Sequence, residues 1–401
     1  MKPVDVALVG LGGYGSFYIG RLLKRQQDGV LRFVGGVEPQ PERCAQLDEL
    51  KAAGVPVFAD LSDFYAKHSA ELVIICAPIH LHCPLTCMAL ERGSHVLCEK
   101  PLAATVQEGE RMKQAERKAG RFVAIGYQWA FSDAIQQFKR DVMAGDFGRP
   151  KRLCGCVLWP RRASYYARNN WAGALKTPGG QLVLDSPANN ATAHYLQIML
   201  YVLGETRETS AVPVDVEAEL YRANRIQNFD TAAICCRMAG DTEVLFLTSH
   251  AIDSHTGPVF QWEFEKGVVE FAAGKAASLR ACLSDGKVRD YGNPYATEDN
   301  KLDQSLAAVR TGETVACGIE AARTHTLCIN AAQESMPEVE VFAEPSIKVQ
   351  QLDDGDTLTC VEGLHAALMQ CFKECVMPHE NGEFSWARQG KLIDLRGYKG
   401  L

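Results

Sequence analysis

Three glycines close to the amino terminus have a spacing that suits the binding of a diphosphate. Gly10, Gly12 and Gly15 form the pattern G-x-G-x-x-G directly after the apolar run 4–9. The first glycine of this pattern allows a tight turn, the second lets the backbone approach a pyrophosphate, and the third lets a following helix pack on the strand. The N–H groups and the dipole at the start of that helix attract phosphate. The predicted dinucleotide cradle consists of Gly10, Gly12, Gly13, Tyr14 and Gly15.

An acidic residue after the next predicted strand indicates which dinucleotide is bound. The apolar segment 31–37 ends directly before Glu38. A carboxylate at this position holds the ribose hydroxyls of NAD. Its charge repels the 2′-phosphate of NADP, and no Arg or Lys directly follows it. We therefore predict NAD as the cofactor.

Further polar residues follow strands in an alternating pattern of strands and helices. Strands are expected at 72–76, 95–98 and 122–125, with helices between them. Such alternation is typical of a doubly wound parallel sheet, which binds its ligand beyond the carboxyl ends of the strands. The candidate cofactor residues in these places are Pro78, His82, Glu99, Lys100 and Gln128.

These motifs together resemble the glucose-fructose oxidoreductase/inositol dehydrogenase/MocA family over roughly the first 335 residues. The matching stretches are Gly10 to Gly15, Ala77-Pro78 with His82, Glu99-Lys100-Pro101 and residues 145–150. The resemblance implies an α/β fold with an N-terminal Rossmann domain and a C-terminal α+β domain that carries a large, mostly antiparallel open sheet. It also implies a homodimer or homotetramer, and a Lys100 that contacts the nicotinamide ribose and the substrate hydroxyl. A buried lysine suits that role, because burial brings its pKa toward neutrality and its charge stabilises a developing alkoxide.

The second domain is expected to contribute its chemistry from residues 179–194. This stretch resembles the family motif G-G-x-L-x-D-x-G-x-H, whose aspartate and histidine meet the sugar or polyol. Asp185 matches the aspartate, whereas Asn189 stands at the histidine position and Pro187 at that of the preceding glycine. A neutral amide cannot exchange a proton near neutral pH, so another group must act as the base. We consider His194, expected on the same helix as Asn189. Its rivals are Lys100, Tyr127 and Tyr166.

The segment 165–171 is rich in groups that stack on sugar rings or bond to hydroxyls. We predict that Tyr166, Arg168 and Trp171 contact the substrate, together with Asn189. A purely structural aromatic cluster is equally compatible with this pattern.

Length and composition bound the class of protein. A chain of 401 residues predicts two domains, since one core rarely serves so many residues. We expect a Rossmann domain at 1–127, a domain for substrate binding and oligomerisation at 128–336, and an extension at 337–401 that packs on the body or a neighbouring subunit. The net charge of −7 gives no electrostatic case for nucleic acid or an anionic membrane. Fifteen scattered cysteines and an amino terminus without a leader pattern predict a reducing cytoplasm.

One cluster of side chains could suggest a metal. It consists of His80, His82, Cys83 and Cys87. The cluster lacks the paired C-x-x-C spacing of structural zinc sites and falls where the nucleotide should lie, so we predict no metal.

The leading hypothesis is an NAD-dependent oxidoreductase acting on a secondary alcohol of a sugar, cyclitol or sugar derivative, with Lys100, Asp185 and His194 as catalytic residues. One alternative is an NAD-dependent glycosidase or lyase that oxidises a sugar transiently and eliminates across the adjacent bond. Another is a non-catalytic protein that senses the nucleotide. The absence of the family histidine at Asn189 keeps the first alternative open.

Overall fold

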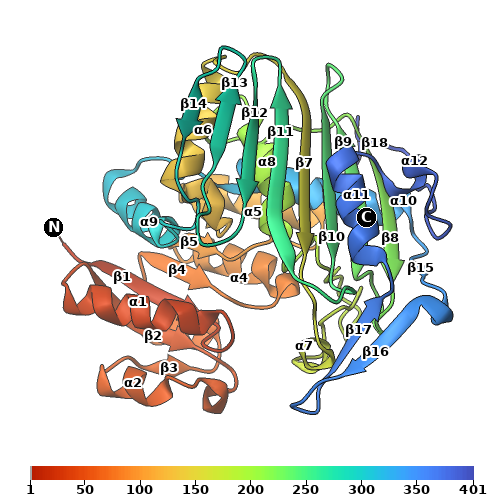
Figure 1. Ribbon diagram of the computed structural model, residues 1–401. Coiled ribbons are helices and arrows are strands. Elements are labelled where there is room, and N and C mark those ends of the chain that lie inside the picture. The colour runs from red at the N-terminus through yellow and green to blue at the C-terminus, as the bar shows by residue number, and fades with distance from the viewer. Residues whose placement is uncertain (1) are drawn as a thin grey trace.

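The first part of the chain forms a parallel sheet around the predicted opening strand (Figure 1). The computed structural model describes residues 2–401. Its six-stranded sheet has the order β3-β2-β1-β4-β5-β6, in which β1 (Val4–Val9) pairs in parallel with β2 (Leu31–Val37) and β4 (Leu72–Ile75). The order reverses at β1, and such a reversal opens the ligand crevice of doubly wound sheets. The predicted Rossmann arrangement is confirmed.

Helices alternate with these strands, and their ends follow local sequence signals. Thr105 and Glu108 form a capping box at the start of α5, and Gly120 ends that helix with a φ of 59°. The segment 41–53 is not one continuous helix, because Cys44 is extended and separates a short 3-10 turn from α2. The remaining elements here are α1 (Gly15–Gln27), η1 (Pro41–Arg43), α2 (Leu47–Ala52), β3 (Val57–Phe58), α3 (Leu61–Lys67), α4 (Ile79–Glu91), β5 (His95–Cys98), α5 (Val106–Ala119) and β6 (Val123–Ile125).

The second part is built on a ten-stranded sheet whose main path runs β14-β13-β12-β11-β7-β10-β9-β8-β15, with β18 also pairing with β8. Most neighbours are antiparallel, as predicted, although β7 pairs in parallel with β10 and β15 with β8. Its main strands are β7 (Pro150–Leu158), β8 (Asp215–Arg222), β9 (Thr231–Arg237), β10 (Glu243–Ser249), β11 (Thr256–Phe264), β12 (Gly267–Ala272), β13 (Arg280–Leu283) and β14 (Val288–Asp290). Short strands complete it: β15 (Glu340–Val341) and β18 (Ile393–Asp394).

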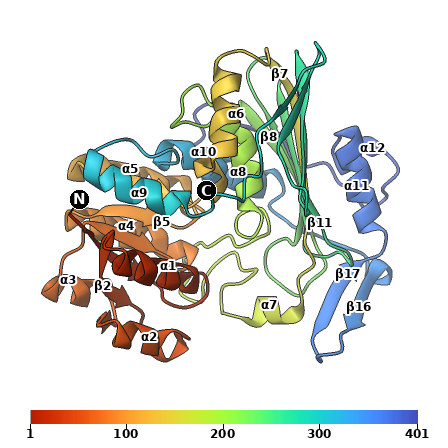
Figure 2. The ribbon, with the colours of Figure 1, turned by 60° about the vertical axis from the view of Figure 1, so that its left-hand side comes forward.

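Apolar helices cover one face of this large sheet (Figure 2). Nearly all of α8 (Ala193–Val202) is buried, as is most of α10 (Ile319–Ser335). Their side chains join the core of the first domain, so a single core extends through both. The other helices of the second part are η2 (Gln128–Phe131), α6 (Asp133–Met143), α7 (Ala163–Ala167) and α9 (Asn300–Thr311).

The last part of the chain covers the opposite face of the same sheet (Figure 2). Leu364, Leu368 and Cys371 of α11 (Leu364–Glu374) are buried in a second core with Cys154 of β7 and Leu245 of β10. The elements of this segment are η3 (Glu344–Ser346), β16 (Ile347–Gln351), β17 (Thr357–Val361), α11 and α12 (Pro378–Asn381). This segment therefore lies on the body of its own chain.

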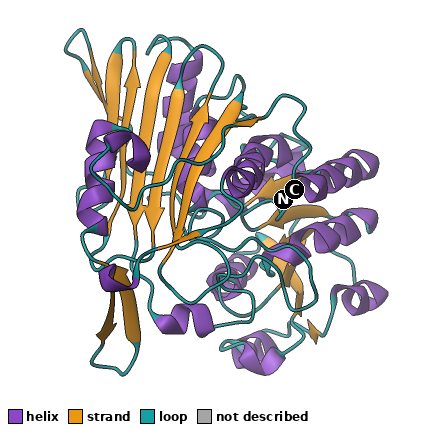
Figure 3. Cartoon of the chain, turned by 90° about the vertical axis from the view of Figure 1, so that its right-hand side faces the viewer, coloured by secondary structure: helices purple, strands orange, loops and turns teal. Residues whose placement is uncertain are grey.

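The carboxyl terminus then returns to the first domain; the two ends of the chain overlap in the view of Figure 3 but lie far apart in Figure 1. Ile393 of β18 pairs with Val216 of β8. Further on, the Gln107 side chain of α5 donates to the backbone oxygen of Leu401 at 2.7 Å. The tail thereby links the outer face of the large sheet to the Rossmann domain.

Two properties of the whole fold bear on the expected class of protein. All fifteen cysteines are free thiols, eleven of them buried. Among residues 2–401, every helix is too short or too polar to traverse a lipid bilayer.

Truncation of Leu368 tests the packing of α11. The side chain is 1% exposed, so Leu368→Ala leaves a cavity between α11 and the sheet. We expect the free energy of unfolding to fall by about 2–4 kcal/mol in urea titrations. Leu392→Ala is the matched control, because Leu392 is 54% exposed and its loss should change stability by less than about 0.5 kcal/mol. Equal effects would show that α11 contributes no packing.

Candidate active site between the two domains

The glycine turn has no room for side chains at its first and third glycines. A Cβ atom at Gly10, whose φ is 84°, would lie 2.6 Å from the Cys76 carbonyl oxygen. One at Gly15 would lie 2.0 Å from the Gly10 carbonyl oxygen. These contacts give the two glycines the turn and packing roles that the sequence predicted.

The middle of the turn is open and offers backbone donors. At Gly12 the nearest atom to an added Cβ is the Arg43 carbonyl oxygen, 4.0 Å away. Within residues 2–401, the N–H groups of Gly12, Gly13 and Tyr14 have no hydrogen-bond partner. They stand at the start of α1, where the helix dipole favours an anion. The turn therefore fits a pyrophosphate.

Glu38 lies directly after β2 beside this turn. Its Oε2 accepts a hydrogen bond from the Leu11 N–H at 3.1 Å, and its Oε1 accepts one from the Gln40 N–H at 3.2 Å. These bonds fix the carboxylate next to the glycine turn. Each oxygen retains a second lone pair that can accept a ribose hydroxyl.

Lys100 follows β5 and reaches across to the second domain. Its Nζ donates to the Asn190 carbonyl oxygen at 2.7 Å and to Asn190 Oδ1 at 3.1 Å. Burial lowers the pKa of Lys100 to about 8, against the opposing effects of the Glu99 and Asp185 charges. The third proton of the ammonium group remains available to another acceptor.

Asp185 is held in the same chain of hydrogen bonds. Its Oδ1 accepts from Asn190 Nδ2 at 2.7 Å, and its Oδ2 accepts from the Gly173 N–H at 2.6 Å. Burial raises the pKa of Asp185 although these bonds and nearby cations act in the opposite direction. The preceding Leu184 has a φ of 49°, which is unusual for a branched residue and indicates local strain. The structure thus connects Lys100, Asn190 and Asp185.

Asn190, the neighbour of the predicted substrate residue Asn189, supplies the amide that links Lys100 to Asp185. Asn189 is 1% exposed, and its Nδ2 donates to the Leu184 carbonyl oxygen at 3.1 Å. The expectation that Asn189 and His194 share a helix is also wrong, because α8 begins at Ala193 and turns precede it. Because turns lead into α8, Asn190 contacts Lys100 and Asp185, and Asn189 donates to the Leu184 backbone. No periodicity in the sequence indicated this arrangement.

His194 lies near Lys100, and its ring has a buried nitrogen without a hydrogen-bond partner among the described residues. Its Nδ1 is buried and has no hydrogen-bond partner within residues 2–401. Burial lowers the pKa of His194 well below its usual range, and the Lys100 charge lowers it further. The ring is therefore neutral at physiological pH and packs edge-on against Tyr127, with 5.9 Å between ring centroids.

Tyr127 is joined to a histidine that sequence reasoning missed. His325 Nε2 lies 3.0 Å from the Ala188 carbonyl oxygen, which can only accept, so this nitrogen carries the proton. The Tyr127 hydroxyl consequently donates to His325 Nδ1 at 2.9 Å. Burial lowers the pKa of His325 to about 4 and raises that of Tyr127. Because the Tyr127 hydroxyl already donates its proton to His325, Tyr127 is a weaker candidate for the catalytic base.

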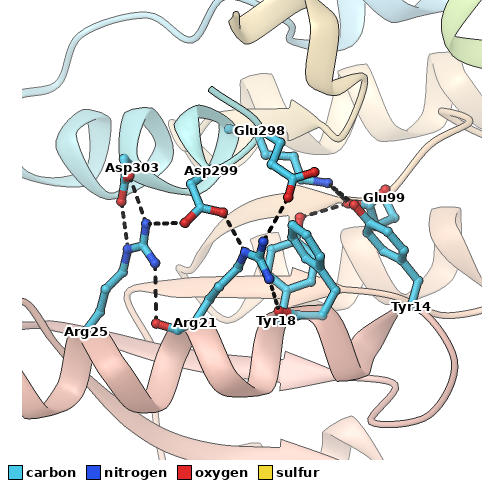
Figure 4. A network of polar contacts seen from close by, with 10 residues as sticks. Tyr14, Tyr18, Arg21, Arg25, Glu99, Glu298, Asp299 and Asp303 are labelled. Carbon is cyan, nitrogen blue, oxygen red and sulfur yellow. Dashed lines mark hydrogen bonds and ion pairs between the residues drawn. The ribbon is translucent and has the colours of Figure 1, made fainter. Parts of the chain in front are cut away.

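A buried ion pair forms at Glu99, the residue that precedes Lys100; Figure 4 shows Glu99 with Tyr14 and Tyr18. Lys301 of α9 donates to Glu99 Oε1 at 2.6 Å and to the Tyr14 hydroxyl at 2.9 Å. Tyr18 donates to the same Glu99 oxygen at 2.8 Å. Burial alone lowers the pKa of Lys301, but Glu99 and Tyr14 more than offset it, so the pKa is raised. The Glu99 carboxylate is thus held by α1 and α9.

Charged residues extend this contact between α1 and α9 toward solvent (Figure 4). Arg21 pairs with Glu298 at 3.0 Å and with Asp299 at 2.5 Å. Arg25 pairs with Asp299 at 3.2 Å and with Asp303 at 2.7 Å. These pairs connect the first domain to the second beside the glycine turn. Nothing in the spacing of Lys301 or its acidic neighbours indicated this contact.

The other predicted cofactor residues lie at the same edge of the sheet. His82 Nδ1 lies 2.7 Å from the Pro101 carbonyl oxygen, and its Nε2 lies 2.9 Å from that of Ala77. Both ring nitrogens thus face backbone oxygens, which leaves neither free for a metal and ties the Pro78 turn to the turn after β5. Gln128 begins η2 directly after β6, half-buried. Cofactor contacts of Pro78, His82 and Gln128 stay predictions.

The predicted substrate residues lie around α7. Arg168 stacks on Tyr165, with its guanidinium carbon 3.7 Å from the ring centroid, and lies 5.6 Å from that of Trp171. The Tyr166 hydroxyl is buried without a hydrogen-bond partner within residues 2–401. Burial has the largest effect on the pKa of Asp185 and of Lys100, and the Arg168 charge is among the smaller effects that lower both. This cluster therefore adjoins the site. Contact with a substrate stays a prediction for Tyr166, Arg168, Trp171 and Asn189.

Comparison with known proteins decides the family of the chain. Residues 4–127 match the model of an oxidoreductase family with an NAD-binding Rossmann fold. This part of the chain belongs to the glucose-fructose oxidoreductase/inositol dehydrogenase/MocA family. Membership confirms the resemblance that the motifs indicated, and the NAD-binding Rossmann domain confirms the cofactor.

Curated members of the family match over different lengths. Inositol 2-dehydrogenase 4 of Saccharopolyspora erythraea is 36% identical over 153 residues, which cover 37% of this chain and 44% of the relative. The chain spans about half the length of several such relatives. Inositol 2-dehydrogenase 1 of the same organism is 27% identical over 361 residues, covering 86% of this chain and 98% of the relative.

A solved structure shares the fold of both domains. It is that of levoglucosan dehydrogenase in complex with NADH and levoglucosan. It is 17% identical, with a TM-score of 0.68, and the match covers 84% of this chain and 97% of that protein. The alignment extends over both domains and supports the overall fold.

Removal of the buried cation tests the contact behind Lys100. Lys301→Met leaves the buried Glu99 carboxylate unpaired, so we expect a loss of about 3–5 kcal/mol in the free energy of unfolding. Adding Glu99→Gln should recover part of this loss, because the double variant has no buried unpaired charge. Lys287→Met, which removes an exposed pair with Asp285, is the control and should change stability by less than about 1 kcal/mol. If the stability changes of Lys301→Met and Glu99→Gln simply add in the double variant, the two side chains are not coupled.

The Glu38 carboxylate should set the preference between dinucleotides. Glu38→Ser removes the charge that repels a 2′-phosphate, so we expect NADH to bind about tenfold more weakly and NADPH to gain affinity. Titrations followed by the fluorescence of the reduced nicotinamide measure both without turnover. Glu42→Ser changes a nearby exposed acid and should leave the ratio unaltered. An unchanged ratio in Glu38→Ser would refute the assignment.

Proposed function

We propose that the protein is an NAD-dependent oxidoreductase that transfers a hydride between the nicotinamide and a secondary hydroxyl or ketone of a sugar, cyclitol or sugar derivative. The observation that carries the proposal is that Asn190 holds the Lys100 Nζ and connects it to Asp185. The names of the relatives, inositol 2-dehydrogenases and a levoglucosan dehydrogenase, support this substrate class.

The protein groups divide the reaction between them. NAD, when bound, supplies the acceptor for the hydride that leaves the carbinol carbon. The hydroxyl proton passes to the neutral amine of Lys100 as the carbonyl forms, so the alcohol loses two electrons and two hydrogens in total. The fixed bonds from Lys100 to Asn190 orient the amine, and Asp185 and Asn190 are placed to hold neighbouring hydroxyls.

The pKa of Lys100, lowered by burial to about 8, suits both directions of the reaction. At pH 7 the Lys100 side chain is neutral in about one molecule in ten, and the neutral amine can accept the proton of an alcohol. The larger charged fraction can donate to a ketone oxygen during reduction. We also retain the cytoplasm as the expected compartment, on the free thiols, and a homodimer or homotetramer as the expected assembly, on analogy with the family.

Substitution of Lys100 tests this function. With NAD and a panel of sugars and cyclitols, we expect Lys100→Met to reduce kcat about 10²–10⁴-fold while NADH binding persists. In the wild type, kcat/KM for oxidation should rise with pH and level off above about 8, because the neutral amine is the reactive form. Asp185→Asn removes a charge that raises this pKa, so it should shift the inflection to lower pH.

Lys391→Met is the control, since Lys391 lies in the carboxyl-terminal segment and should retain full activity. Stopped-flow absorbance at the NADH band measures the rates. The proposal fails if no member of the panel reduces NAD, or if Lys100→Met keeps the wild-type rate.

A second candidate function follows from His194. Its buried Nδ1 gives the site a neutral base besides Lys100, and an enzyme that eliminates after transient oxidation needs to remove a second proton, from carbon. Such a glycosidase or lyase would return the hydride to the sugar. Cleavage of p-nitrophenyl glycosides that requires NAD but accumulates no NADH would favour it, and His194→Phe should then abolish cleavage while sparing simple oxidation.

A further inference from the structure

Two arginines near the proposed site share one aromatic ring. The guanidinium carbon of Arg161 lies 4.9 Å from the centroid of Tyr165, and that of Arg168 lies 3.7 Å from it. Trp159 and Trp171 flank the pair, each 5.6 Å from the nearer guanidinium. Stacking fixes the planes of the two cations; Arg168 Nη1 donates to the Tyr165 carbonyl oxygen, and the remaining N–H groups at the edges are available for hydrogen bonds.

Neither cation is neutralised by an acid. Within residues 2–401 no carboxylate forms an ion pair with Arg161 or Arg168, whereas the adjacent Arg162 pairs with Asp354 at 2.5 Å. The two buried acids of this region are occupied: Asp185 accepts from Asn190 and Gly173, and Asp230 accepts from three N–H groups and from Thr231. With Lys100 the described residues of the region hold three cations against the two carboxylates of Asp185 and Asp230, so a net positive charge remains that attracts an anion.

Buried polar atoms beside the arginines also have no partner within the described residues. They are Arg161 Nε, the Tyr166 hydroxyl and His250 Nε2. His250 Nδ1 donates to the Trp159 carbonyl oxygen at 2.8 Å, so its Nε2 carries the lone pair. Burial lowers the pKa of His250 to about 3 and keeps the ring neutral. The cluster therefore offers donors to an oxyanion and an acceptor to a hydroxyl, a combination that matches an acidic sugar.

This cluster adjoins the reacting groups. Burial has the largest effect on the pKa of Tyr165 and Tyr166, and the Asp185 charge raises both further; for Tyr166, Asp230 and Tyr165 act more strongly than Asp185. The Arg168 charge lowers the pKa of Lys100, although burial and three other charges have larger effects. A single sugar could therefore present one hydroxyl to Lys100 and an acidic group to the arginines.

We propose that Arg161 and Arg168, with Tyr166 and His250, form a subsite for an oxyanion of the substrate, so that the protein acts on acidic sugars in preference to neutral ones. The inference rests on the proposed function and narrows its substrate class. Carboxylate and phosphate share the recognised chemistry, since both accept paired N–H donors from guanidinium groups.

Matched pairs of sugars test the subsite. Isothermal titration of the NADH-loaded protein compares D-glucuronate with D-glucose, D-galacturonate with D-galactose, and D-glucose 6-phosphate with both series. We expect at least one acid to bind tenfold or more tightly than its neutral partner, and Arg161→Gln and Arg168→Gln each to reduce that ratio about tenfold. Tighter binding of uronates identifies the oxyanion as carboxylate, and tighter binding of the phosphate ester identifies it as phosphate.

Arg162→Gln is the matched control, because its side chain is paired with Asp354 outside the cluster and should keep the full preference. Because Arg168 is exposed, we expect Arg168→Gln to fold normally. Thermal melts check the folding of each variant. Equal binding of acids and neutral partners, no binding of any acid, or a preference that survives both substitutions overturns the inference. If NAD is still reduced by neutral sugars in a Lys100-dependent reaction, the proposed function stands without the subsite.

Discussion

The whole site depends on one side chain of the first domain being held by the second. The Lys100 ammonium group finds its acceptors in the backbone and side chain of Asn190, and Asn190 in turn donates to Asp185. A buried cation is costly unless hydrogen bonds replace its water shell. The two domains must therefore stay in contact at this point for Lys100 to remain charged, and the same bonds fix the position of the amine.

The surrounding structure reinforces this contact from behind. Glu99 precedes Lys100 in the chain, and its pairing with Lys301 joins the end of β5 to α9. The arginines of α1 extend the same contact by pairing with acids at the start of α9. Removal of Lys301 would leave the Glu99 carboxylate buried and unpaired, so this contact depends on both partners. The resulting rigidity suits a site that must hold a nucleotide and a sugar in fixed register.

The carboxyl-terminal segment changes what the large sheet can contact. Helix α11 covers the strands β7 and β10 on the face opposite α8 and α10 (Figure 2). A subunit that docked on that part of the sheet would have to displace α11. An oligomer built on this chain therefore needs another surface, or the part of the sheet formed by β11 to β14.

Local signals in the sequence determined much of the architecture. The glycine spacing, the alternation of apolar strands with helices, and the motif around Lys100 predicted the Rossmann sheet, its cofactor and the family, because these features depend on periods and turns within short segments. The mixed turn at 41–46 escaped prediction, since the extended Cys44 has no distinctive composition. Residue types alone also identified Asp185, whose neighbours in the chain carry the family pattern.

Tertiary structure decided which side chains meet. Asn190 contacts Lys100 and Asp185, while the neighbouring Asn189 donates to the Leu184 backbone, because turns, and not a helix, lead into α8. Lys301 and His325 come from helices far along the chain, and Arg161 and His250 from the ends of β7 and β10, so no spacing joins them to the glycine turn. A sequence specifies local conformation through short-range sterics and periodicity. Contacts between distant segments depend instead on how two domains pack, and only the folded chain contains that information.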